Sequence, residues 1–144
     1  EQAQKMIEMH PNLPQPYYVL GCAHVVTGGF AEAIAAFQKA ADVSRDTMSL
    51  SFLGLAYGMS GQTDKARAIL SELQEKARRE FVPSARFAYL YFPLGEMDKA
   101  LEYLEKAYED RDSHLFWLRN VPFYGPLSSD PRFQDLLRRM NFPP

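Results

Sequence analysis

The sequence predicts an all-α protein made of a repeated helical unit, and three observations support this. Leu-Gly or a close equivalent, then Gly, then Ala, recurs in three registers that begin near Pro14, Thr47 and Phe81, spaced 33 and 34 residues apart. In every register the second Gly precedes the Ala by five residues. Apolar residues recur at helical spacing, and no alternation of apolar and polar residues is long enough for a strand. A fixed period of this length predicts stacked structural repeats.

Turn and cap residues divide the chain into helices. Gly28, Gly61 and Gly95 each follow a helical stretch and suit the left-handed turn that ends it. Pro83 suits the first turn of a helix, whereas Pro93 should end or bend its helix early. The expected helices cover residues 1–10, 14–27, 30–43, 47–60, 63–79, 83–94 and 97–110.

The period and the residue pattern resemble the tetratricopeptide repeat, whose 34-residue unit carries Leu-Gly, Tyr, Ala, Phe and Pro at set positions. The resemblance implies a right-handed α-solenoid in which each unit is a pair of antiparallel helices. Small residues such as Gly21 and Ala33 let the paired helices approach, and large ones such as Phe37 fill the space between repeats. The resemblance also divides the chain into units. They are the second half of a preceding repeat (1–13), three repeats (14–46, 47–80 and 81–114) and a degenerate unit with a C-terminal capping helix (115–144).

The C-terminal thirty residues differ from the repeats. Leu115–Asn120 is a candidate for a truncated helix, and Asp130-Pro131 begins a helix with a capping carboxylate and a first-turn proline. One helix face then carries Phe133, Leu136, Leu137 and Met140. The end of a solenoid needs a cap that covers its last helix pair. We therefore expect the aromatic residues of this segment to form the packing of that cap. They are Phe116, Trp117, Phe123, Tyr124, Phe133 and Phe142.

Residues 81–144 also resemble the C-terminal repeat region of large bacterial regulatory proteins, in which a winged-helix domain, a nucleotide cyclase or a Ser/Thr kinase lies upstream. The resemblance rests on Leu94-Gly95-Glu96-Met97-Asp98-Lys99-Ala100 and on Leu127-Ser128-Ser129-Asp130-Pro131-Arg132-Phe133. The present sequence departs from the pattern of those proteins at Gly125, where they tend to have Asp. The resemblance places residue 144 near a natural C-terminus, and Glu1 is expected to be a cut or a processed start.

Composition and charge exclude several functional classes. The net charge is −2, and both 1–80 and 81–144 carry eight basic and nine acidic residues, which argues against nucleic-acid binding. No apolar run approaches the length of a membrane span. The single cysteine, Cys22, allows no internal disulfide. We expect a cytoplasmic protein, or a periplasmic one if the parent chain has an upstream membrane span.

The sequence contains no motif that supports catalysis or metal binding. Cys22 and His24 are two positions apart on a helix and therefore point to different faces, and no histidine is followed by a ligand-type residue three or four positions later. No phosphate loop, nucleophile elbow or zinc-protease motif is present. We therefore expect no enzyme activity, no cofactor and no metal. The basic clusters at 76–79 and 138–139 are interpreted as helix-end charges.

The predicted function is protein–protein interaction through the concave groove that the resemblance implies. The nine groove residues share helix faces and are mostly apolar or aromatic, which suits an apolar or amphipathic peptide or a neighbouring domain. They are Tyr18, Cys22, Val25, Ser51, Leu55, Met59, Arg86, Tyr89 and Phe92. Truncating Tyr89 and Leu55 to alanine is expected to weaken binding and leave helicity intact. Two alternatives stay open: the chain itself covers the groove, or residues 1–10 mediate self-association as a homodimer.

Overall fold

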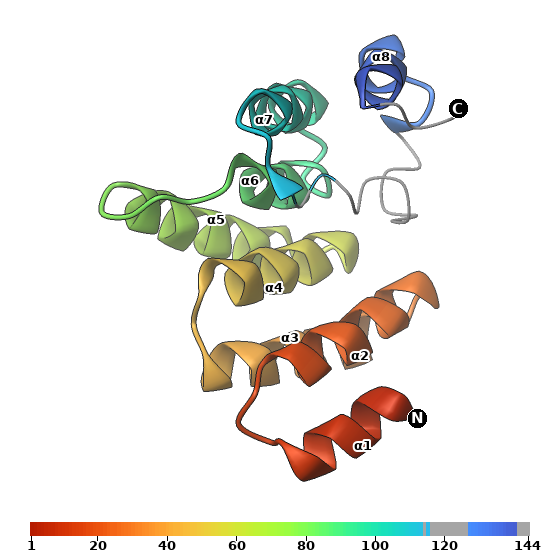
Figure 1. Ribbon diagram of the computed structural model, residues 1–144, viewed down its shortest axis with the longest axis vertical. Helices are drawn as coiled ribbons and strands as arrows, with labels where there is room; N and C mark the ends of the chain where they lie inside the picture. Colours follow the sequence, from red (N-terminus) through yellow and green to blue (C-terminus); the bar gives the residue numbers. More distant parts are fainter. Residues whose placement is uncertain (114, 116–126, 141–144) are drawn as a thin grey trace. The chain divides into compact units, whose positions relative to one another are not determined.

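A computed structural model of the chain describes residues 1–113, 115 and 127–140, and within these ranges it contains α-helices and no strand (Figure 1). The expected all-α fold is therefore confirmed. Two compact units follow one another along the chain, Glu1–Val82 and Pro83–Pro144. The helices are α1 (Gln2–Met9), α2 (Gln15–Val26), α3 (Phe30–Val43), α4 (Thr47–Met59), α5 (Thr63–Ala77), α6 (Ser84–Tyr91), α7 (Met97–Glu109) and α8 (Pro131–Arg139).

The first unit contains two helical hairpins, α2–α3 and α4–α5, preceded by α1. The connection within each hairpin is only three residues long, so the two helices run antiparallel. Gly28 and Gly61 lie in these connections with φ of +79° and +82°. A side chain disfavours this left-handed conformation, which explains why glycine recurs at the end of each first helix.

The contact between α2 and α3 depends on the small size of Gly21. A Cβ atom at Gly21 would lie 2.3 Å from Cε1 of Phe37, closer than two carbon atoms can approach. The Phe37 ring is completely buried and stacks on Phe52 of α4, with ring centroids 5.3 Å apart. One aromatic side chain thus joins the first hairpin to the second, as expected for a residue that fills the space between repeats.

An ion pair links the connection between α3 and α4 to helix α5. Arg45 Nε and Nη2 donate to Glu72 Oε1 and Oε2 at 2.6 and 2.7 Å. The pKa of the Glu72 carboxyl is lowered, first by this hydrogen bond and then by the nearby charge of Arg45. The two parallel hydrogen bonds fix the orientation of the Arg45 guanidinium relative to the Glu72 carboxylate. They therefore hold the α3–α4 connection next to α5.

The second unit begins with the hairpin α6–α7, which turns at Gly95 with φ of +77°. Tyr103 of α7 stacks against Phe87 and Tyr91 of α6, with ring centroids 4.9 and 5.4 Å apart. The structure ends α6 at Tyr91, two residues before Pro93, as the missing N–H of proline predicts. The expected range of 83–94 is therefore too long for this helix.

The last described helix, α8, begins as expected. The Asp130 carboxylate accepts a hydrogen bond from the backbone N–H of Arg132 at 2.8 Å, and Pro131 occupies the first turn. Phe133 and Leu136 are buried. The expected truncated helix after Leu115, the departure at Gly125 and five of the six aromatic residues assigned to the cap lie outside the described residues.

Candidate binding surface

The nine predicted groove residues belong to α2, α4 and α6 or lie directly after α6, but most of them are buried. Cys22 and Met59 are half-buried. The other seven, listed with their exposed fractions, are Tyr18 (9%), Val25 (5%), Ser51 (0%), Leu55 (1%), Arg86 (4%), Tyr89 (4%) and Phe92 (4%). Their side chains therefore contribute to packing in this structure, and the groove as a peptide site stays a prediction.

Tyr18 has a specific structural role that its position in the repeat did not indicate. Its hydroxyl lies 3.1 Å from each carboxylate oxygen of Asp46 and 2.8 Å from Oγ of Ser49. Asp46 is also the N-cap of α4, because its Oδ1 accepts the backbone N–H of Ser49 at 2.8 Å. The hydroxyl of Ser44 donates to Oδ2 at 3.1 Å. One carboxylate therefore ties α2, the end of α3 and the start of α4 together.

The α4 and α6 candidates are enclosed even more completely. Ser51 turns its hydroxyl back to the carbonyl of Met48 at 3.0 Å, so this polar side chain is satisfied within its own helix. Every residue of α6 is buried, including the charged Arg86. A helix that offered one face to a peptide would expose part of that face, and α6 exposes none.

Cys22 is the half-buried member of the set on α2. Burial raises the pKa of its thiol to about 11, so the thiol stays protonated at neutral pH and is a weak nucleophile. In residues 1–113, 115 and 127–140, no three His, Cys, Asp or Glu side chains converge as a metal site would require. No described helix is both long and apolar enough to cross a bilayer.

An exposed apolar stripe lies on α2 beside Cys22. It consists of Val19, Ala23 and Val26, spaced four and three positions apart, and the two valines are 59% and 60% exposed. This α2 stripe lies next to the predicted set of Tyr18, Cys22 and Val25, shifted by one position. The same spacing is visible in the sequence, but the sequence does not say which of two adjacent stripes is buried.

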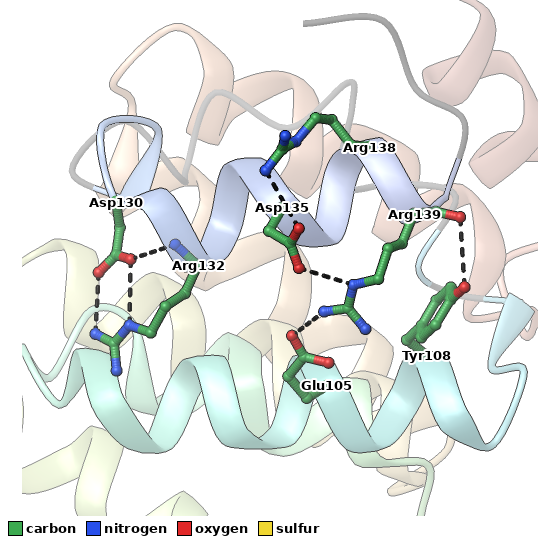
Figure 2. Close-up of polar contacts among 7 residues, drawn as sticks. All are labelled: Glu105, Tyr108, Asp130, Arg132, Asp135, Arg138 and Arg139. Carbon is green, nitrogen blue, oxygen red and sulfur yellow. Dashed lines mark hydrogen bonds and ion pairs between the residues drawn. The ribbon is translucent and has the colours of Figure 1, made fainter.

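The basic clusters are largely neutralised by neighbouring carboxylates. Lys76 and Arg78 of the first cluster lie 3.6 and 3.3 Å from Glu80 and Glu75. Both arginines of the second cluster contact Asp135 on their own helix, and Arg139 also donates to Glu105 of α7 (Figure 2). The basic side chains named here therefore each have an acidic neighbour.

Two family models that are both described as tetratricopeptide repeat match the chain. One matches residues 14–47 and 85–109, and the other matches residues 53–78, so together they span more than half of the chain. The three matched segments correspond in turn to the hairpins α2–α3, α4–α5 and α6–α7. No curated protein matches the chain in sequence.

Proposed function

We propose, on the premise that this chain belongs to the tetratricopeptide repeat family, that it is a scaffold that binds an apolar or amphipathic segment of another protein or domain. Tetratricopeptide repeats generally mediate protein–protein interactions and are typically non-enzymatic. We further propose which surface of the chain binds the partner. The first hairpin offers the binding face, and the candidates on and directly after α6, Arg86, Tyr89 and Phe92, serve internal packing.

The observation that carries this proposal is the α2 stripe of Val19, Ala23 and Val26 beside the half-buried Cys22. Burying a valine side chain contributes about 1.5–3 kcal/mol, so two such residues on one helix face supply a substantial part of a binding free energy. No acidic or basic residue belongs to the stripe, which favours an apolar partner segment over a charged peptide terminus.

The test is a selection of amphipathic peptides against the whole chain, followed by fluorescence anisotropy with the selected peptides. Replacing Val19 and Val26 together by lysine should weaken binding at least about tenfold, because both apolar contacts are replaced by charges. Val43→Lys is the matched control, since Val43 is also exposed but lies on α3. Equal affinity of the double variant and the control would refute the α2 stripe as the binding face.

A second candidate function is self-association through the N-terminal helix. None of the side chains of α1 is buried, and Met6 and Met9 are 42% and 66% exposed, with Leu13 at 46% after the helix. Exposed apolar side chains gathered on one element favour association with another protein surface. This candidate requires dimers of the chain without any ligand, which separates it from the first.

The wider context is also part of the proposal. Residues 81–144 resemble the C-terminal repeat region of bacterial regulatory proteins, and the capped start of α8 at Asp130-Pro131 belongs to that pattern. In such a setting the partner is a neighbouring domain of the same polypeptide or a protein that biases an effector domain. The expected compartment is the cytoplasm, or the periplasm if the parent chain has an upstream membrane span.

A further inference from the structure

Two cross-helix ion pairs join α8 to α7 with matching spacing. Arg132 Nη1 lies 2.9 Å from Asp98 Oδ1, and the Arg139 guanidinium donates to the Glu105 carboxylate. The two carboxylates are seven positions apart on α7, and the two arginines are seven positions apart on α8. Because the order of the partners is the same along both helices, α7 and α8 run parallel, in contrast to the antiparallel hairpin α6–α7.

Further contacts extend this pairing at the C-terminal end of the two helices. The Arg139 guanidinium carbon lies 5.0 Å from the centroid of the Tyr108 ring, and the Tyr108 hydroxyl donates to the Arg139 carbonyl at 3.4 Å (Figure 2). Between the two arginines, Phe133 and Leu136 of α8 are buried, as are Leu101 and Leu104 between the two carboxylates of α7. Each helix therefore carries buried apolar residues between the two charged residues that pair with the other helix.

The attachment of α8 is local and sensitive to charge. The helix has nine residues and two buried side chains, which is short for a helix to be stable without a partner. Its two pairs to α7 lie at the surface, with side chains 56% and 89% exposed for Arg132 and Asp98 and 37% and 38% exposed for Arg139 and Glu105. Pairs with this exposure are weak individually and are screened by salt.

We propose that α8 is an exchangeable latch: it pairs with Asp98 and Glu105 on one face of α7, and a partner helix of the same chemistry binds that face when α8 leaves. The chemistry of the partner is given by α8 itself, an amphipathic helix with two basic residues seven positions apart that flank an apolar pair. Complementary charge is already demonstrated by the contacts of Arg132 and Arg139. Such a helix recognises a surface through its apolar face and is oriented by its charges.

This surface is separate from the α2 stripe, and its test does not depend on the function proposed above. The probe is a fluorescein-labelled synthetic peptide of residues 127–140, and the protein is the whole chain with Arg132→Glu and Arg139→Glu to open the latch. A competing segment within the chain lowers the apparent affinity by the fraction of time that the site is free. The peptide should therefore bind the opened chain at least about tenfold more tightly than the native chain.

Two controls make the assay specific for charge at this face. Arg138→Glu should leave the affinity at the native value, because Arg138 pairs with Asp135 of its own helix at 3.2 Å. In the chain with Asp98→Lys and Glu105→Lys, the native peptide should fail to bind, and a peptide in which both arginines are glutamate should bind. Failure of this charge exchange would overturn the proposal.

Hydrogen exchange tests the same proposal on the native chain, so its result does not depend on whether a substituted chain folds. Raising the NaCl concentration from about 0.05 to 0.5 M should accelerate amide exchange in α8 and leave α4 protected, because salt screens the two surface pairs. Equal peptide affinity for the native and opened chains, or α8 exchange that is independent of salt, would overturn the latch.

Discussion

At the scale of single residues, Asp46 has an unusual concentration of roles. Its carboxylate caps α4 and also accepts hydrogen bonds from the hydroxyls of Tyr18 and Ser44. A carboxylate held by several donors loses little by leaving bulk water, because each donor replaces a water molecule. The position before Thr47 therefore does more than begin a helix, since it also connects the first hairpin to the second.

Removal of the Tyr18 hydroxyl measures this connection. Tyr18→Phe should lower the free energy of unfolding by about 1–2 kcal/mol, because the buried hydroxyl bonds to a charged group. Tyr17→Phe is the matched control: its hydroxyl donates to the Pro11 carbonyl at 3.2 Å at an exposed site, and the loss should stay below about 0.5 kcal/mol. Urea titration of both variants distinguishes them, and equal losses would show that the Tyr18 hydroxyl is not special.

The close packing at Gly21 yields a second prediction. Gly21→Ala should destabilise the chain by about 1–3 kcal/mol despite the better helix propensity of alanine, because the new methyl group overlaps the buried Phe37 ring. Phe37→Leu in the same chain removes the overlapping ring atoms and should make the Gly21→Ala step less costly. A double-mutant cycle by urea unfolding gives the coupling, and a coupling near zero would contradict the overlap.

Burial changes what truncation of the groove candidates should do. The sequence led us to expect that Tyr89→Ala and Leu55→Ala would affect binding alone, but Leu55 is 1% exposed and Tyr89 is 4% exposed. Leu55→Ala should therefore lower the unfolding free energy by about 2–5 kcal/mol through the cavity that it leaves. Met59→Ala, at a half-buried site of the same helix, should cost less. Thermal melts followed by circular dichroism give the ranking, and the reverse order would refute the packing role of Leu55.

At the scale of helices and their connections, the Arg45–Glu72 pair couples the α3–α4 connection to α5. The pKa of Glu72 is lowered by the hydrogen bond from Arg45, so the folded state holds the charged form more strongly than the unfolded chain does. This contribution is complete above the unfolded pKa, which is near 4.5, and is lost as the pH falls through the folded value.

The pair should therefore lose its contribution to stability in acid. Because both side chains are partly exposed, its value at neutral pH is at most about 1 kcal/mol. Urea unfolding at pH 7 and pH 3 should show a larger drop for the native chain than for Glu72→Gln, which cannot titrate. Glu75→Gln is the control, since Glu75 pairs locally, with Arg78 directly after the same helix. An equal drop in the native chain and Glu72→Gln would rule out this linkage.

At the scale of the whole chain, the even distribution of charge leaves association to apolar surface. Both halves of the sequence carry one net negative charge, so long-range repulsion between copies is weak. The exposed apolar side chains of α1 are candidates for a contact between copies.

This surface gives a prediction for the oligomeric state. If α1 mediates self-association, light scattering across a concentration series should show dimers of the native chain without any ligand. Replacing Met6 and Met9 together by lysine should then return the chain to monomers, whereas Val43→Lys should not. Monomers of the native chain at every concentration would eliminate this alternative and leave the ligand-binding scaffold.

The repeat pattern was sufficient to predict the fold class, because helix periodicity, turn glycines and close-packed small residues are local consequences of side-chain size and backbone freedom. The positive φ at Gly28, the complete burial of Ala33 and the cap at Asp130 all follow from residues that the sequence displays. The early end of α6 before Pro93 follows in the same way.

Which stripe of each helix faces inward was decided only by tertiary packing. A helix face is defined by spacing of three and four, and adjacent stripes share that spacing, so α2 could equally have buried Val19 and Val26 in place of Tyr18 and Val25. The parallel pairing of α8 with α7 was likewise hidden, because Asp98 and Arg132 are far apart along the chain. Local spacing therefore determines the helices and their turns, whereas the surface left for partners depends on long-range contacts that bury one stripe and expose the next.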